Sequence, residues 1–282
     1  MSRCVLIAVV VALLPAGRAA IGQSISADQT VNRLSDYVEQ YYTRAQSIVT
    51  DESVTVQQIK RDLTADGFAR RLVYELRVEW DPSVSGDESP ARVTRQLLSV
   101  NGKPPREKDK PECTDPLSIS PEPLAFLLRN RRHKYSFTSA GIGRIDGREA
   151  LMIDYRSLES REPKVEWKDT CVSVDTPSRG RLWADQESGA IIRLDENLLG
   201  MVDFPIPRKH QQINGALFMT LERADTSIRY RPVRFSNPDE TLLLPADITS
   251  ASLWRNAGSA GIRVTQSFSN YRRFVTAGRI LR

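Results

Sequence analysis

Apolar and polar positions alternate in two different ways along the chain, and the first pattern predicts a long helix. From Ser26 to about Thr50, apolar residues recur at spacings of three and four, which places them on one face of an α-helix. The stripe consists of Val31, Leu34, Val38, Tyr41, Ala45 and Ile48. Ser26 and Gln29 have the spacing of a capping box at the helix start. We expect the stripe to pack on the protein's own sheet.

After residue 53 the pattern changes to short segments with a period of two, which predicts β-strands. The predicted strands are 54–61, 71–80, 93–100, 135–140, 150–157, 165–174, 181–185, 190–196, 228–235, 248–255 and 262–274. Asn101-Gly102 and Asp146-Gly147 are dipeptides that favour tight hairpin turns. Strands and helices do not alternate, so we expect an antiparallel sheet and an α+β fold class.

Two segments interrupt the strand pattern. Residues 101–123 hold six prolines and predict a long surface loop. Residues 120–130 predict a short second helix, with Ser120 as N-cap and Pro121 at the first helical position. Its basic end, the run RNRRHK, suits the negative pole of a helix.

The N-terminal sequence MSRCVLIAVVVALLPAGRAAIGQ predicts an export signal. One arginine precedes a short apolar run, which Pro15 and small residues follow. The run is too short to span a bilayer, although an uncleaved anchor remains the alternative interpretation. We expect residues 1–22 to be a signal peptide, residues 23–282 to form a single domain, and the mature protein to be periplasmic or secreted.

The net charge limits the kinds of partner that the sequence predicts, and the cysteine count predicts a disulfide. Losing Arg3 and Arg18 with the leader lowers the formal charge from +5 to +3, an excess too small to predict nucleic acid binding. Mild attraction to an anionic membrane surface is compatible with this charge. Two cysteines remain, Cys113 and Cys171, and an oxidising compartment favours a disulfide between them. Two free buried thiols are the alternative.

The stretch GRLWADQESGAIIRLDE, residues 180–196, packs four carboxylates around a Ser-Gly turn. A three-residue loop with Gly189 in the left-handed conformation pairs Arg181 with Asp195 and Trp183 with Arg193, and pairs Leu182 with Leu194 and Ala184 with Ile192 on the other face. The carboxylates do not converge in this register. We therefore expect a hairpin rather than a cation site.

Side chains of the types that bind metals or act in catalysis do not cluster in the sequence. His133 and His210 lack metal-ligand spacing and are interpreted as surface residues, and no phosphate-binding or nucleophile motif is present. The sequence thus predicts no cofactor, no metal and no catalytic residues. The predicted strands carry Trp80, Trp167, Trp183 and Trp254, which could line a concave apolar surface or pack in an ordinary core.

Several phrases of the chain resemble a known superfamily. The helix SDYVEQYYTRAQSIVTDE precedes GRIDGREALMIDY, GRLWADQESGAIIRLD, LLLPADITSASLW and VTQSFSNYRRF. This order is similar to that of the periplasmic lipoprotein carriers and outer-membrane lipoprotein-sorting proteins, and more closely to uncharacterised exported bacterial proteins. The resemblance covers most of residues 28–275. The proline-rich loop, the cysteine pair and the extra strands depart from the carrier pattern, and no lipid-attachment cysteine follows the leader.

The resemblance implies a strongly curved antiparallel half-barrel, with a long N-terminal helix and a short second helix on its concave side. It also implies an apolar cavity that accepts acyl chains. The leading hypothesis is a non-enzymatic binding protein for a lipid or a lipoprotein acyl chain. Its expected ligand-binding residues are Trp80, Leu124, Phe126, Leu127, Trp167 and Trp254. An interaction module for envelope proteins, with a self-filled core, is the alternative, and an unrecognised hydrolase is a third interpretation.

Overall fold

A computed structural model describes most of the chain after residue 26. It describes residues 27–45, 48–80, 91–107, 109, 113, 124–145, 147–158, 163–168, 171–213, 215–236 and 238–273. The predicted signal peptide, the Ser26 cap and the predicted start of the second helix at Ser120 lie outside these residues. None of the described helices is long and apolar enough to cross a membrane.

The described residues form one α-helix, three short 3-10 helices and thirteen strands. The helices are α1 (Ala27–Arg44), η1 (Leu124–Leu127), η2 (Arg132–Lys134) and η3 (Arg208–Ile213). The strands are β1 (Ile48–Ile59), β2 (Arg70–Trp80), β3 (Ala91–Val100), β4 (Tyr135–Ile145), β5 (Arg148–Ser157), β6 (Lys164–Lys168), β7 (Cys171–Asp175), β8 (Ser178–Ala184), β9 (Ile191–Leu198), β10 (Val202–Pro205), β11 (Phe218–Ser236), β12 (Asp239–Arg255) and β13 (Gly261–Arg273).

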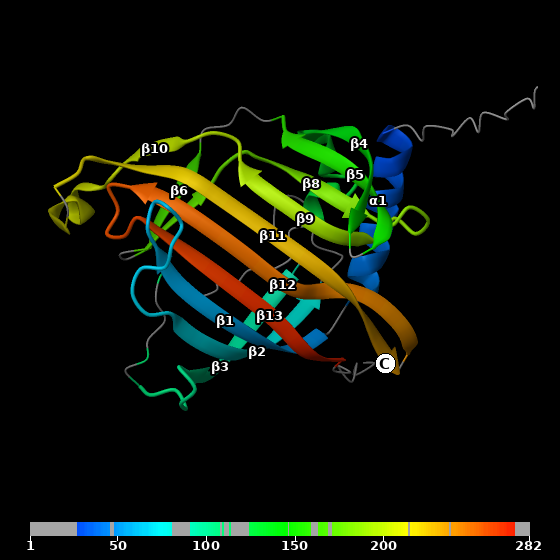
Figure 1. The fold of residues 1–282 in the computed structure, drawn as a ribbon, viewed down its shortest axis with the longest axis horizontal. Helices are drawn as coiled ribbons and strands as arrows, with labels where there is room; N and C mark the ends of the chain where they lie inside the picture. The colour runs from blue at the N-terminus through cyan, green and yellow to red at the C-terminus, as the bar shows by residue number, and fades with distance from the viewer. Residues whose placement is uncertain are drawn as a thin grey trace, which may run out of the picture.

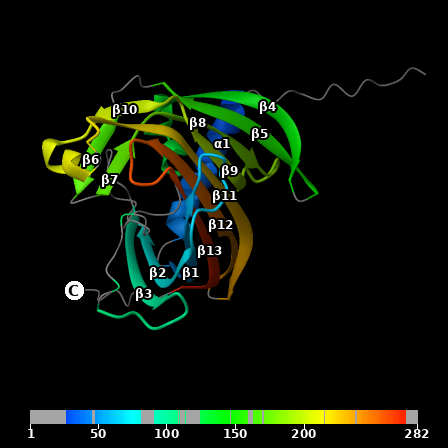
Figure 2. The same cartoon turned by 60° about the vertical axis from the view of Figure 1, so that its left-hand side comes forward.

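The strands confirm the predicted antiparallel arrangement. One large sheet has the order β3-β2-β1-β13-β12-β11-β9-β8-β5-β4, with β10 also paired to β11, and β6 and β7 form a separate hairpin. Every pair of strands among the described residues is antiparallel, including β1 with β13 from the two ends of the described chain. The sheet is open and strongly curved, and α1 lies in its concavity (Figures 1 and 2).

The predicted apolar stripe faces the sheet, but the helix is shorter than expected. Val31, Leu34, Val38, Tyr41 and Ala45 are all buried in the main core cluster. The helix ends at Arg44, and Ile48 belongs to β1. The segment Ile48–Thr50 pairs with β2, and its β-branched residues suit a strand. Ile48 continues the stripe because its strand position also points into the core.

The second helix is not confirmed as an α-helix. Within the described residues, the 120–130 segment forms only the four-residue 3-10 helix η1. Leu124, Phe126 and Leu127 are nevertheless buried, in the same core cluster as α1. Packing against α1 and the sheet positions them, and a regular helix is not needed for that.

Strand prediction was wrong at three places. The predicted strand 165–174 is the hairpin β6–β7, in which Lys168 lies opposite Cys171. Both of its arms place apolar residues on one cluster, so a period of two does not reveal where the chain reverses. Strands β11 and β12 begin well before the predicted strands. A register irregularity between Leu221 and Arg223 interrupts the alternation of β11, and β12 carries the continuous apolar run 242–245, which ends in a proline. The short strand β10 was not predicted.

The concavity beneath α1 is filled by a row of aliphatic side chains that crosses five strands. Adjacent partners in this row are Ile153, Leu182, Leu194, Ile228 and Ile248. Each of these residues is buried, and all belong to the cluster that contains the stripe of α1. This half of the sheet therefore has a packed interior.

Candidate ligand-binding cavity

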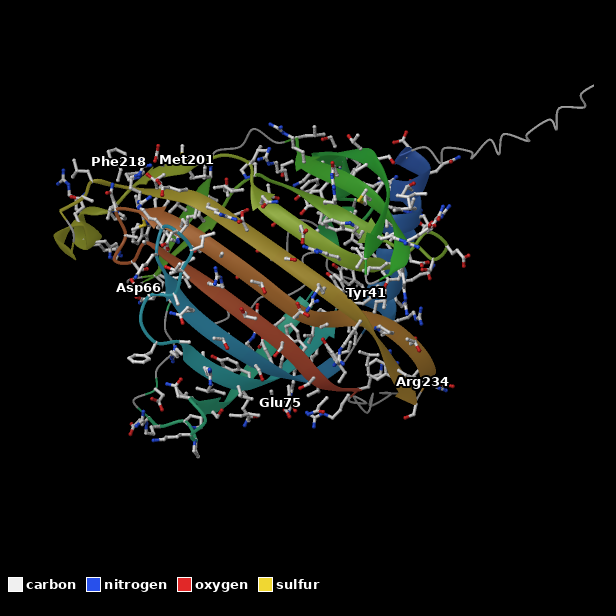
Figure 3. All side chains as sticks on the ribbon, in the orientation of Figure 1. Tyr41, Asp66, Glu75, Met201, Phe218 and Arg234 are labelled. Atoms are coloured by element: carbon white, nitrogen blue, oxygen red, sulfur yellow. A yellow bond between two sulfur atoms is a disulfide. The ribbon has the colours of Figure 1, made fainter. Side chains whose placement is uncertain are left out.

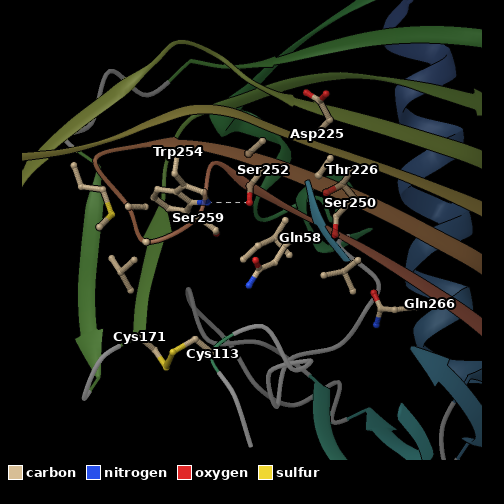
Figure 4. Close-up of a pocket in the computed structure, with 18 residues that line it drawn as sticks. Gln58, Cys113, Cys171, Asp225, Thr226, Ser250, Ser252, Trp254, Ser259 and Gln266 are labelled. Carbon is tan, nitrogen blue, oxygen red and sulfur yellow. Dashed lines mark hydrogen bonds between the residues drawn. A yellow bond between two sulfur atoms is a disulfide. The ribbon is translucent and has the colours of Figure 1, made fainter. Parts of the chain in front are cut away.

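A cavity of about 660 Å³ lies on the concave face, at the end of the sheet away from α1 (Figure 4). Strands β1, β7, β11, β12 and β13 contribute lining residues, together with the turn after Trp254 and the Cys113–Cys171 pair. Ligand sites in proteins typically have volumes of roughly 300–1,000 Å³. The cavity is thus large enough for a small molecule or an acyl chain.

The cavity exists because side chains become smaller along the strands. On β11 the inward positions pass from Ile228 to Thr226, and on β12 they pass from Ile248 to Ser250 and Ser252. Thr226 is paired with Ser250, and Ser250 is paired with Val264 on β13. Short side chains on neighbouring strands therefore meet at one place and leave the curved sheet unfilled.

Aromatic residues form the wall at the outer end of the cavity. Trp254 lines the cavity, and its indole Nε1–H donates a hydrogen bond to Ser252 Oγ at 2.9 Å (Figure 4). Phe204 contacts Trp254 edge-on at 6.3 Å between ring centroids, and Trp167 contacts Phe204 in the same manner at 6.3 Å. The three rings belong to one apolar cluster, which gives this end of the cavity a rigid hydrophobic wall.

The disulfide closes another side of the cavity. Cys113 and Cys171 are bonded, as predicted, across a sequence separation of 58 residues. Both cysteines line the cavity next to Val172 of β7. The bond therefore ties the proline-rich segment to the β6–β7 hairpin at the edge of the cavity.

A buried polar group lies at the inner end. Gln266 lines the cavity, and its Nε2 donates a hydrogen bond to Glu52 Oε1 at 2.6 Å. Arg95 donates to both oxygens of the same carboxylate, at 2.6 and 3.2 Å. The Glu52 side chain has no exposed surface and that of Arg95 is 8% exposed. The cavity thus runs from an aromatic end to an end that offers amide and hydroxyl groups.

A second carboxyl, partly buried, lies beside the cavity floor. Glu196 is the register partner of Thr226, and its Oε2 accepts hydrogen bonds from Tyr155 Oη at 2.9 Å and Ser178 Oγ at 3.0 Å. Burial raises the pKa of the Glu196 carboxyl above its ordinary value, while the two hydroxyl donors partly offset this effect. Burial likewise raises the pKa of Tyr155, so this phenol remains a donor. The hydroxyl groups of Tyr155 and Ser178 thus hold the Glu196 carboxyl in place as a hydrogen-bond acceptor.

The predicted ligand-binding residues fall into separate places. Trp254 lines the cavity, and Trp167 supports the aromatic wall. Leu124, Phe126 and Leu127 lie in the packed core under α1. The backbone of Trp80 is in β2, and its side chain lies outside the described residues. Sequence reasoning missed the floor residues Thr226, Ser250, Ser252 and Gln266, although the run TSAS at 249–252 was a signal of small side chains within a strand.

The 180–196 stretch is a hairpin, as predicted, with one change of register. Arg181, Leu182 and Trp183 have their predicted partners Asp195, Leu194 and Arg193, and Gly189 has a φ of +71°. The guanidinium of Arg193 lies 5.0 Å from the Trp183 ring centroid.

Two details of that hairpin were wrong. An irregularity after Trp183 places Ala184 opposite Ile191 instead of Ile192, which buries Ile191. Arg181 forms its ion pair with Asp154 of the adjacent β5, at 2.6 Å, and not with Asp195. A partner from a third strand could not be read from the hairpin alone.

In the part of the chain that the structure describes, no three His, Cys, Asp or Glu side chains gather to hold a metal ion. His133 is exposed, as predicted. His210 is not a simple surface residue, because its ring stacks on Trp167 at 4.8 Å between centroids.

The described residues thus define an open, strongly curved antiparallel sheet with a helix in its concavity and a cavity at the other end. No protein-family model matches the sequence, and a search of curated proteins returns no match. Solved structures that are similar include a LolA superfamily protein from Nitrosomonas europaea, at 10% identity and a TM-score of 0.38, covering 89% of this chain and 95% of that one. A putative outer membrane lipoprotein-sorting protein domain from Vibrio parahaemolyticus has 10% identity and a TM-score of 0.37, covering 90% and 96%.

A third similar structure is the MucA/MucB complex of Pseudomonas aeruginosa, at 8% identity and a TM-score of 0.24, covering 86% of this chain and 99% of that one. The first two structures carry the names of the groups that the sequence resembles. All three TM-scores are below 0.5.

Proposed function

We propose that the protein is an exported, non-enzymatic binding protein that holds an apolar or amphiphilic ligand, a lipid or a lipoprotein acyl chain, in the concave cavity. The observation that carries the proposal is a hollow of about 660 Å³ between a hydrophobic wall and a polar inner end. Each methylene group that leaves water contributes about 0.8 kcal/mol. An acyl chain against Trp254, Val172 and Ile262 would gain binding energy in this way, with its polar group near Gln266.

Two features support export. The apolar run from Val5 to Leu14 follows a basic residue near the N-terminus. The Cys113–Cys171 disulfide is a bond that persists in oxidising compartments such as the periplasm or the extracellular space. We therefore assign the protein to one of these two compartments.

The division of the concave face gives the predicted residues different roles in this proposal. Trp254 contacts the ligand and Trp167 keeps the aromatic wall in place. Leu124, Phe126 and Leu127 close the α1 end and prevent the ligand from entering the core there. The ligand then occupies only the end with small side chains.

Filling the cavity tests the proposal. Ser250→Phe places a ring among the floor residues and is expected to reduce ligand occupancy at least about tenfold, because the ring takes volume that the ligand needs. Thr249→Phe is the matched control, since Thr249 is the neighbouring residue of β12 and is exposed on the other face. Native mass spectrometry of protein purified from its own cell envelope measures bound lipid directly.

Bound lipid in the wild type and in Thr249→Phe, with bare protein for Ser250→Phe, supports the proposal. A wild-type protein that is bare under gentle ionisation, or a Ser250→Phe variant that retains the lipid, would refute it. Thermal unfolding of each variant establishes that the protein is folded before the comparison is made.

An interaction module for envelope proteins is the second candidate. The packed core under α1 favours it, because half of the concave face is already occupied by the protein's own side chains. Cross-linking in the native envelope followed by affinity purification would return a stoichiometric protein partner under this alternative, with no lipid in the cavity.

A further inference from the structure

We propose that one end of the molecule, the tip formed by the β10–β11 connection, docks on an anionic lipid bilayer. The tip is defined by Arg208, Lys209, Leu217 and Phe218. Figure 3 shows Phe218 at the end of the molecule that lies away from α1. This inference does not depend on what the cavity binds.

Two consecutive apolar side chains are exposed at the tip. Leu217 is 62% exposed and Phe218 is 55% exposed. Phe218 lies opposite Pro205, and the Ile206 N–H donates a hydrogen bond to the Leu217 carbonyl, so both residues lie where β10 and β11 meet the connection that carries η3. Neighbouring exposed apolar side chains of this kind mark a surface that another apolar phase covers.

The charge of the tip selects an anionic partner. Residues 204–221 contain Arg208 and Lys209 and no Asp or Glu. Both cations are exposed on η3. A connection that exposes two apolar side chains and two cations, and that has no Asp or Glu between Phe204 and Leu221, fits the boundary between headgroups and acyl chains of an anionic membrane.

The tip is held in shape by the residues beneath it. The His210 ring stacks on Trp167, and Gln211 Nε2 donates a hydrogen bond to the Ile206 carbonyl at 2.7 Å. These contacts turn the inner side of η3 toward the β6–β7 hairpin. Arg208 and Lys209 are thereby left on the outside.

A further exposed apolar side chain lies at the same end of the sheet. Phe68, in the β1–β2 loop, is completely exposed. Arg61 of this loop forms a 2.7 Å ion pair with Glu222 of β11. The loop contains Asp62 and Asp66 as well as Lys60 and Arg61, so it adds apolar surface without adding net charge.

The tip adjoins the cavity. Met219, the residue after Phe218, lines the cavity. Asn256 Nδ2 donates a hydrogen bond to the Phe218 carbonyl at 3.1 Å and so joins the tip to the turn beside the cavity. Docking through the tip would bring the aromatic end of the cavity to the membrane surface.

Vesicle binding tests the proposal. Purified protein is mixed with vesicles of phosphatidylethanolamine and phosphatidylglycerol in a 3:1 ratio (about one anionic lipid in four), and bound protein is measured by flotation. The double variant Leu217→Ser/Phe218→Ser is expected to bind at least about tenfold more weakly, because both apolar anchors are lost. Arg208→Gln and Lys209→Gln are each expected to weaken binding about fivefold, an effect that salt removes.

The matched control is Ile142→Ser/Leu158→Ser, which removes two apolar side chains of similar exposure, 55% and 60%, from elsewhere on the surface. This control and the cavity variant Ser250→Phe should float with the vesicles as the wild type does. The proposal is overturned if the wild type does not float, or if the tip variant and the surface control lose binding equally. A protein that binds only a protein partner would give the first of these outcomes.

Discussion

Glu52 and Arg95 form a buried ion pair, and removing one of the two side chains should destabilise the folded protein. The two side chains are almost completely removed from solvent and share two hydrogen bonds. Glu52→Ala removes the carboxylate that pairs with the buried Arg95 guanidinium, and breaking a buried ion pair typically costs about 3–5 kcal/mol. We expect urea unfolding to show a loss of this size.

Two further variants test whether the loss of stability depends on the burial of the ion pair. Asp247→Ala breaks the more exposed pair with Arg229 and should cost less than about 1 kcal/mol. Replacing Glu52 and Arg95 together by leucine and methionine should recover most of the loss, because no unpaired charge remains. A Glu52→Ala variant as stable as Asp247→Ala would contradict the importance of burial.

Glu196 provides a prediction about pH. Its raised pKa means that the folded state holds a proton more tightly than the unfolded state does. This contribution to stability is present below the ordinary pKa of 4.5 and is lost as the pH rises through the folded-state pKa. Glu196→Gln keeps an oxygen that accepts from Tyr155 and Ser178 and carries no charge. We expect it to raise the melting temperature by about 3 °C at pH 8 and to leave it unchanged at pH 4.

Glu187→Gln is the control for this experiment, since Glu187 is exposed in the turn of the same hairpin. Its melting curves should follow those of the wild type at each pH. An equal effect of Glu196→Gln at pH 4 and pH 8 would show that the proton is not involved.

At the scale of elements, the disulfide attaches the small β6–β7 hairpin to the proline-rich segment. In the chain-entropy model, closing a loop of 58 residues stabilises the folded state by about 4 kcal/mol. The double variant Cys113→Ser/Cys171→Ser is expected to lose stability of this order in urea unfolding. Because both cysteines line the cavity, it should also lose bound lipid.

Reduction of the wild type should reproduce the effect, and the same reductant should not change the double variant. Two equivalents of reactive thiol in the unreduced, unfolded wild type would show that the bond does not form in the cell.

At the scale of the whole molecule, the two halves of the curved sheet have different interiors, one packed and one hollow. The half that carries large aliphatic residues packs on α1, and the half that carries Thr226, Ser250 and Ser252 leaves a cavity. The packed half fixes the curvature, so the other half keeps its concave shape without side chains to fill it. If the tip docks on a bilayer as proposed, the aromatic end of the cavity lies close to the membrane surface.

Local periodicity was sufficient to predict several parts of this protein from the sequence. The stripe of α1 repeats every three or four residues, and the hairpin around Gly189 pairs charged residues with charged residues and leucine with leucine. These features depend on neighbours within one element or across one turn, which a sequence displays directly. The cysteine pair was predictable because only two cysteines follow Cys4, which lies within the predicted signal peptide.

The tertiary structure alone decided which distant strands are neighbours, and with them the site. The pairing of β1 with β13 brings Glu52 to Gln266, and the order β13-β12-β11 brings the small residues of two strands together. Within its own segment, none of these residues shows a pattern that predicts a cavity. A cavity arises only where side chains from several strands are short at the same depth of a curved sheet, and that coincidence is a property of long-range pairing.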